Sequence, residues 1–212
     1  MWFNDTDPAG HWSDAIPHLS RDRVLRKLIA RVGPCTLRPR RDYFVKLVQS
    51  ILSQQVSVKA ADAMYRRLAG QFPSQRPTPA RMVRFLTQGD ESLIRACGLS
   101  RQKRGYLLDL SQRFAAGTIR PQRFASMSDD EVIATLTQVN GIGVWTGQML
   151  LIFALARPDV WPTGDLGLQH NLHINFPKHF TARPKPRDIE SFADPWRPYR
   201  SIATWYLWQS GR

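Results

Sequence analysis

The sequence LTQVNGIGVWTGQMLLIFALARPDVWPTGDLGLQ spans residues 136–169 and contains the features that decide the fold. Gly141 and Gly143 bracket a short turn between two segments with helical apolar spacing. After the second, strongly apolar segment, a single carboxylate, Asp165, stands in a loop flanked by proline and glycine. The stretch therefore predicts a helical hairpin whose second helix leads to one isolated acid.

The composition limits the class of protein. The chain has 212 residues, a hydrophobic fraction of 42% and a formal net charge of +13. This much apolar material builds a full core, and the excess of positive charge favours a polyanionic partner, most simply nucleic acid. The alternative is a basic, well-solvated surface without a specific partner.

Cysteine usage and terminal sequence indicate the compartment. Cys35 and Cys97 are too few for a disulfide framework, which favours a reducing environment. No apolar run reaches the roughly 18 residues of a membrane span. The N-terminus has neither the basic start nor the apolar stretch of a signal peptide. We expect a cytoplasmic or nucleoid-associated protein without a membrane partner.

The apolar spacing along the chain is helical, and no segment alternates as a strand would. We therefore expect an all-α fold with two helical lobes, a helix-hairpin-helix motif and an active-site cleft between the lobes. Residues 1–19 are expected to be an irregular arm, followed by a helix that Ser20 caps. The expected divisions are 1–41 (the arm and a basic helix packing on the second lobe), 42–140 (the central lobe) and 141–212 (the second half of the hairpin, the Asp165 loop and the closing helices).

The turn at Gly141 and Gly143 has the chemistry of an anion site. Glycine permits positive φ and close approach of another backbone. The second helix starts at the turn, so its unpaired N–H groups and its dipole point outward, where they would suit a phosphate. The alternative is a plain turn between two helices with no ligand.

Several segments together resemble a known family. LTQVNGIGVWTGQMLL resembles the helix-hairpin-helix of the DNA glycosylase superfamily, and DVWPTGDLGLQ resembles its Gly/Pro…Asp segment. ILSQQVSVKAA, GLSRQKRGYLLDL, NGIGVWTGQ and PWRPYRSIATWYLW resemble the 3-methyladenine DNA glycosylase II branch. The similarity extends from about Asp42 to Gly211.

The resemblance implies two ligands at the hairpin. One is a DNA phosphate, held by the backbone amides of Gly141 and Gly143 with Thr146 nearby. The other is a structural monovalent cation, and no further cofactor is required. The turn has Asn140 where a proline is usual, which makes it less rigid. The cation would bind the backbone carbonyls of Thr137, Val139 and Gly141.

The resemblance also implies a catalytic acid. Asp165 matches the family's catalytic aspartate, and Gly164 stands where a second acid is often found. The alternative is that Asp165 is the N-cap of the helix LGLQHNL, and both interpretations can hold together. Relatives that also cut the DNA backbone use a lysine amine at the position of Trp145. The resemblance therefore implies a monofunctional enzyme; the alternative is that Trp145 is a core residue.

Further side chains are assigned to the lesion and to the DNA gap by the same resemblance. Trp208 matches an aromatic residue of the base pocket, Met149 stands where a pocket tyrosine is usual, and Trp145 completes the pocket. Gln54 and Gln55 match the tip that enters the minor groove, and Gln55 matches the inserted residue. The alternative for this tip is a helix end that bonds water. Residues 100–106, SRQKRGY, are either a DNA contact or a solvated helix start.

The function implied is release of alkylated purines of the 3-methyladenine type from double-stranded DNA by a monomer, leaving an abasic site. One rival is a non-catalytic binder of damaged DNA with the same fold. Others are a glycosylase for other modified bases and a basic structural component of a nucleic-acid complex. His170, His173 and His179 lack the cysteine or acid that would complete a catalytic zinc site.

Overall fold

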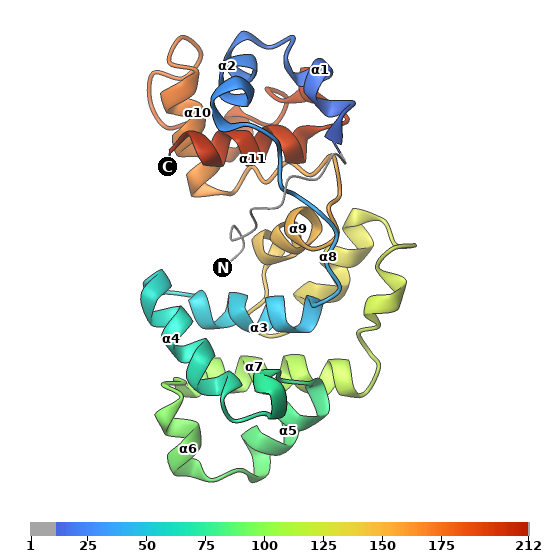
Figure 1. Cartoon of the computed structure of the whole chain (residues 1–212), viewed down its shortest axis with the longest axis vertical. Coiled ribbons are helices and arrows are strands. Elements are labelled where there is room, and N and C mark those ends of the chain that lie inside the picture. The colour runs from blue at the N-terminus through green and yellow to red at the C-terminus, as the bar shows by residue number, and fades with distance from the viewer. Residues whose placement is uncertain (1–11, 212) are drawn as a thin grey trace. The chain divides into compact units, whose positions relative to one another are not determined.

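The structure is a computed structural model that describes residues 12–211 (Figure 1). Within this range every regular element is a helix and no residue lies in a strand, which confirms the predicted all-α class. The described chain divides into two compact units, a central unit of residues 40–150 and a terminal unit of residues 12–39 and 151–211. The second boundary falls inside helix α9 (Val144–Phe153), later in the chain than the division expected at residue 140.

The central unit is built around a packed group of helices. Helix α5 packs against α7, and α3 packs against both α4 and α7. Leu47 of α3 and Leu107 and Leu110 of α7 are fully buried in this core. The helices of the unit are α3 (Tyr43–Ser53), α4 (Val58–Ala69), α5 (Pro79–Gln88), α6 (Glu91–Ala96), α7 (Arg101–Ala115), α8 (Asp129–Thr137) and the first part of α9.

Serine caps define where several of these helices begin. The hydroxyl of Ser57 accepts a hydrogen bond from the Ala60 amide at the start of α4, and Ser100 caps α7 in the same way. Ser128 and Glu131 form a reciprocal capping box at the start of α8. Because each cap satisfies an amide that the helix leaves unpaired, these local sequences determine where α4, α7 and α8 begin.

The terminal unit combines segments from both ends of the chain. Helix α11 packs against α2 and against α10. The Tyr206 hydroxyl of α11 donates to the Gly33 carbonyl at the end of α2, 3.0 Å away. Burial raises the pKa of the neighbouring Cys35 thiol to about 12, so that thiol stays protonated. The helices are α1 (Ala15–Leu19), α2 (Arg23–Val32), α10 (Leu166–Asn175) and α11 (Arg200–Ser210).

Two expectations about the N-terminal segment are wrong. Residues 15–19 form the short helix α1, and the part of the expected arm at residues 1–11 lies outside the described residues. The cap of α2 is Asp22, whose carboxylate accepts from the amides of Val24 and Leu25 at 2.8 and 3.1 Å. Ser20 instead ends α1. The chain turns between Ser20 and Asp22, so the second helix starts later than the capping pattern predicted.

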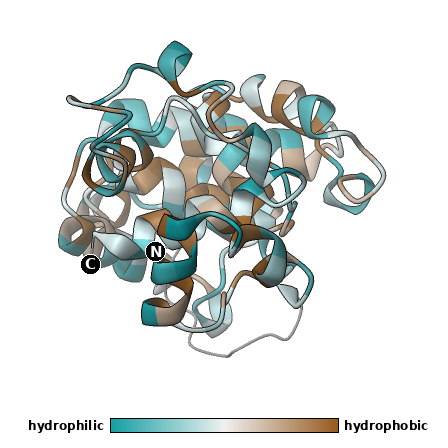
Figure 2. Ribbon diagram, turned by 90° about the horizontal axis from the view of Figure 1, so that it is seen from above, coloured by the Kyte–Doolittle hydropathy of each residue, from teal (hydrophilic) through white to brown (hydrophobic). Residues whose placement is uncertain are grey.

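Helices α2, α3, α4 and α5 are amphipathic. Figure 2 shows helices that carry both apolar and polar residues, as expected when one face of a helix enters a core. Within residues 12–211 none combines the length and the apolarity needed to cross a bilayer.

Candidate functional site

The carboxylate of Asp165 is held in place at the start of α10. Its Oδ1 accepts hydrogen bonds from the Leu168 amide at 2.6 Å and from the Trp208 indole Nε1 at 2.9 Å. Asp165 is only 8% exposed. The N-cap interpretation is therefore confirmed, and the same carboxylate contacts a tryptophan that comes from a different helix.

Trp208 is itself fixed by stacking. Its ring lies on Phe153, the last residue of α9, with centroids 5.3 Å apart and planes 19° from parallel. Both indole and carboxylate are therefore constrained before any ligand arrives. Phe153 was not predicted, although it follows Met149 by four residues, a spacing that places the two on one face of α9.

The loop before Asp165 is held by its own backbone. The Asp165 amide donates to the Pro162 carbonyl at 2.9 Å, and the Gln169 side-chain amide donates to the Thr163 carbonyl at 2.8 Å. Gln169 is buried. These bonds make the acid part of a tight turn followed by a helix, a rigid support for a reacting group.

The predicted hairpin is present between α8 and α9. The Ile142 amide donates to the Val139 carbonyl at 3.0 Å, and Gly141 has a φ of +82°. The Asn140 amide donates to Asp109 of α7 at 2.8 Å. Asp109 also pairs with Arg113 at 2.7 Å, which offsets its negative charge beside the turn. Asp109 was not predicted, because nothing in the local sequence links it to the hairpin.

The two glycines of the turn have different surroundings. A Cβ on Gly141 would overlap the ring of Tyr106, and its positive φ is unfavourable for residues with a side chain. A Cβ on Gly143 would meet nothing within 4 Å. Gly141 is therefore required by the fold, whereas the fold leaves Gly143 open.

The residues at the start of α9 lie at the protein surface. Gly143 is exposed, and Val144 is 55% exposed. The first amides of a helix lack intrahelical acceptors, and the helix dipole adds partial positive charge there. Thr146 lies in the same turn but is only 4% exposed, so its hydroxyl is withdrawn from the surface. The geometry suits an anion bound by backbone amides.

The carbonyls predicted to bind a monovalent cation lie in this turn. That of Val139 accepts from the Ile142 amide, and that of Gly141 accepts from the Gln54 side chain at 2.7 Å. Thr137 ends α8. Because a donor already approaches Gly141, a cation would have to share that oxygen. The cation site stays a prediction.

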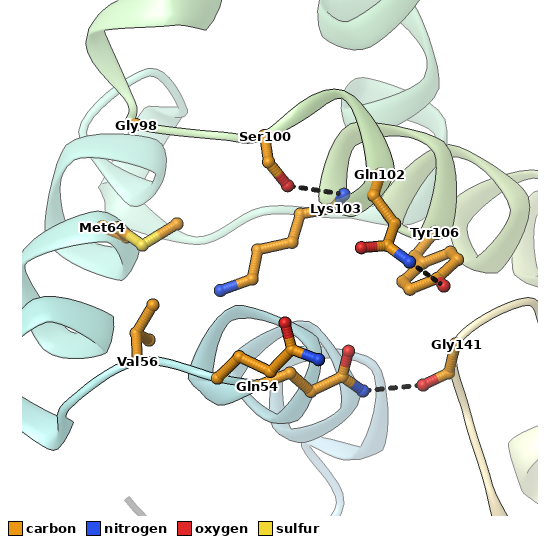
Figure 3. Close-up of a pocket in the computed structure, with 10 residues that line it drawn as sticks. Gln54, Val56, Met64, Gly98, Ser100, Gln102, Lys103, Tyr106 and Gly141 are labelled. Carbon is orange, nitrogen blue, oxygen red and sulfur yellow. Dashed lines mark hydrogen bonds between the residues drawn. The ribbon is translucent and has the colours of Figure 1, made fainter.

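A pocket of about 440 Å³ opens in the central unit beside the hairpin (Figure 3). Lys103 of α7 extends across it, and its ammonium donates to the Leu52 carbonyl near the end of α3 at 2.6 Å. Burial lowers the pKa of this lysine. Its charge faces the C-terminal end of α3, where the helix dipole favours a cation. Lys103 belongs to the segment SRQKRGY, and its hydrogen bond links α7 to the end of α3.

The tip that carries Gln54 and Gln55 borders this pocket. Gln54 turns toward the hairpin and bonds Gly141, whereas Gln55 is exposed and has a φ of +58°. Val56 and Val58, which follow, are 40% and 68% exposed. The tip and the start of α4 thus present exposed apolar side chains that were not predicted, since nothing in the sequence marks a valine as exposed.

The remaining pocket residues lie on α9. Trp145 is 43% exposed, and Met149 is 2% exposed. Both belong to the central unit, whereas Asp165 and Trp208 belong to the terminal unit. The structure brings together Asp165 with Trp208 and Gln54 with Gly141. A shared pocket that includes Trp145 and Met149 stays a prediction.

Within the part of the chain that the structure describes, no three His, Cys, Asp or Glu side chains gather into a metal-binding group.

The chain is similar to known DNA repair proteins in sequence and in fold. The family model for HhH-GPD superfamily base excision DNA repair proteins matches residues 48–198. DNA-3-methyladenine glycosylase 1 of Schizosaccharomyces pombe is 33% identical over 194 residues, which cover 89% of this chain and 81% of that protein.

Two solved structures share the fold closely. One is 3-methyladenine DNA glycosylase from Schizosaccharomyces pombe in complex with abasic DNA, with a TM-score of 0.79, 32% identity and coverage of 93% of this chain and 96% of that one. The other is DNA-3-methyladenine glycosidase from Bacillus halodurans, with a TM-score of 0.79, 27% identity and coverage of 95% and 89%. The chain belongs to the HhH-GPD superfamily of base excision DNA repair proteins.

Proposed function

We propose that the protein is a monofunctional DNA glycosylase that releases alkylated purines of the 3-methyladenine type from double-stranded DNA and leaves an abasic site. The observation that carries the proposal is the buried Asp165 carboxylate, fixed by the Trp208 indole, in a chain of this superfamily. The names of its relatives support the substrate class. The protein would act as a monomer.

Asp165 would act on the sugar. Breaking an N-glycosidic bond develops positive charge on the sugar ring, as in glycoside hydrolysis. A fixed carboxylate in a buried site stabilises that charge without reorganising, and it can orient the attacking water. An alkylated purine that carries a positive charge is already a good leaving group, so a second acid at the position of Gly164 is not needed.

The base must first leave the duplex, at a cost of a few kcal/mol that is smallest for damaged pairs. We propose that Trp208, Trp145 and Met149 receive it. A cationic base over an indole face gains about 0.5–2 kcal/mol. This preference for positive charge would favour alkylated purines over normal ones.

The DNA backbone would be held at the hairpin. The backbone amides of the exposed residues Gly143 and Val144 would bind a phosphate, and the net charge of +13 adds attraction that is independent of sequence. The exposed Val56 would act as an apolar wedge between base steps, and Gln55 would fill the space that the base leaves with a polar side chain that can hydrogen-bond to a base edge.

Trp145, which stands where relatives that cut the DNA backbone have a lysine, supports a reaction without strand cleavage. A Schiff base with the sugar needs an amine, and the indole of Trp145 supplies none. The products would be a free base and an intact strand with an abasic site.

The direct test is incubation with methylated duplex DNA, chromatography of the released bases and electrophoresis of the strands. We expect 3-methyladenine among the bases, and strand breaks only after alkali. Binding without release would identify a non-catalytic damage binder, and release of oxidised or mismatched bases alone would identify a different glycosylase.

Replacing Trp208 with Phe is expected to slow base release about 10- to 100-fold. The ring can still stack on Phe153, but Asp165 loses a hydrogen bond, and such bonds to a charged group contribute about 1.5–3 kcal/mol. Single-turnover rates on methylated DNA measure the effect.

The matched control is Trp196→Phe. The Trp196 indole also donates to an N-capping carboxylate, that of Asp22, at 3.3 Å in the same unit. Both substitutions should lower stability, but only Trp208→Phe should lower the rate at saturating enzyme. Equal rates for the two variants would show that the Trp208–Asp165 bond is purely structural.

DNA binding is expected to depend steeply on salt. Each neutralised phosphate contributes a slope of about −0.9 in log affinity against log salt for duplex DNA, so several contacts lower affinity by about 10²-fold or more between about 50 and 200 mM. Fluorescence anisotropy with undamaged duplex at several salt concentrations gives the slope. A flat response would exclude the phosphate contacts proposed here.

A further inference from the structure

We propose that Gln54 is a positioning residue that locks the exposed tip of residues 54–57 onto the hairpin turn, so that Gln55 meets the DNA in a fixed orientation. The inference rests on the proposed function, since it concerns how the duplex is opened. Gln54 itself would not touch the base; it would act through Gln55 and through the backbone of Gly141.

The first support is the direct bond between the two DNA-facing segments. The Gln54 side-chain amide donates to the Gly141 carbonyl at 2.7 Å, across 87 positions of sequence (Figure 3). Gln54 is the C-cap of α3, and Gly141 lies in the turn between α8 and α9. One hydrogen bond therefore joins the segment proposed to enter the groove to the segment proposed to hold a phosphate.

The second support is that the anchor point is rigid. The Tyr106 ring packs on Gly141 so closely that no side chain would fit there. The neighbouring Asn140 amide is held by Asp109, which is paired with Arg113. A tip bonded to Gly141 is thus bonded to a point fixed by α7.

The third support is the backbone of Gln55. Its φ of +58° is a left-handed backbone conformation that residues other than glycine rarely adopt. Such a conformation persists only where the surroundings hold it. Here Lys103 holds the end of α3 through the Leu52 carbonyl, Gln54 holds the tip to the hairpin, and Ser57 caps the next helix.

The consequence is a fixed distance between Gln55, which would enter the duplex, and the hairpin turn, which would hold a phosphate. When the hairpin holds a phosphate, the Gln54 bond would set the position of Gln55 relative to that phosphate. The tip would then need no conformational change of its own to reach the base stack. Without the bond, Gln55 would relax from its strained backbone and enter the duplex less often.

The test uses Gln54→Met, which keeps the length and packing of the side chain and removes its N–H donor. 2-Aminopurine placed beside the lesion reports base extrusion, and single-turnover release and binding to a duplex with an abasic-site analogue are measured alongside. We expect extrusion and release at subsaturating enzyme to fall about tenfold, with a smaller change in the rate at saturation. Melting temperatures confirm that the variants are folded.

The matched control is Gln71→Ala. Gln71 also donates its side-chain amide to a backbone carbonyl of the central unit, that of Arg67 at 3.4 Å, but on the exposed surface. This variant should match the wild type in extrusion and in release.

A double-mutant cycle with Gln55→Ala decides whether Gln54 acts through Gln55. If it does, the double variant should be no worse than Gln55→Ala alone, because the effects of coupled residues do not add. Additive losses, or a Gln54→Met enzyme equal to the wild type, would overturn the inference. A wild-type protein that releases no base would instead refute the proposed function, while the same cycle on abasic-duplex binding would still test the positioning role.

Discussion

Asp165→Asn is expected to lower the rate of base release by about 10²- to 10³-fold or more while DNA binding survives. The size follows from removing one preorganised electrostatic group in a water-poor site. Asparagine keeps an oxygen that can accept from Leu168 and Trp208, and it caps helices about as well as aspartate. The fold should therefore persist. Single-turnover release from methylated DNA and affinity for a duplex with an abasic-site analogue are the two measurements.

A second capping carboxylate in the same unit supplies the control for this experiment. Asp22 also caps a helix, and its carboxylate also accepts from an indole, that of Trp196. The Asp22 carboxylate accepts from the helix amides through Oδ1 and from the indole through Oδ2, so Asp22→Asn keeps the cap, gives up the indole bond and removes a capping charge in the same unit. It should leave the rate of base release unchanged. If the two variants behave alike, Asp165 is only a helix cap and the proposed mechanism is wrong.

Gly141→Ala is expected to destabilise the protein by about 2–5 kcal/mol. A left-handed conformation costs a residue with a side chain about 1–2 kcal/mol, and forcing a methyl group into the Tyr106 ring adds about 1–3 kcal/mol. The turn should also lose its affinity for phosphate, so DNA binding by the folded fraction should weaken. Urea denaturation gives the free energy of unfolding, and anisotropy at low temperature gives the affinity.

Gly143→Ala separates the fold from the ligand at the same turn. Its added Cβ meets no protein atom within 4 Å, so stability should change little. If the backbone approaches a phosphate there, affinity for DNA should still fall. A second check is a double-mutant cycle with Tyr106→Ala: in that background Gly141→Ala should cost less stability, and this recovery is the part of the loss that comes from the clash. No recovery would place the whole cost in the backbone conformation.

Local sequence predicted the elements well where the signal is short-range. The glycines of the turn, the apolar helix after it and the cap at Asp165 each depend on residues within a few positions of one another. The cap of α2 was misplaced at Ser20 because serine and aspartate both cap helices, and the bend that decides between them depends on α1. Short-range rules cannot rank two good caps two positions apart.

The sequence by itself determined the helical class, the hairpin, the excess of positive charge and the choice of Asp165 as the candidate catalytic acid. Tertiary structure alone decided the partners: Trp208 bonds Asp165 across 43 positions, Gln54 bonds Gly141 across 87, and Tyr106 fills the space above the turn. Helix propensities and caps act over one or two turns of chain. Contacts between distant residues depend on how the helix faces pack, and that packing is set by the whole core rather than by any single segment.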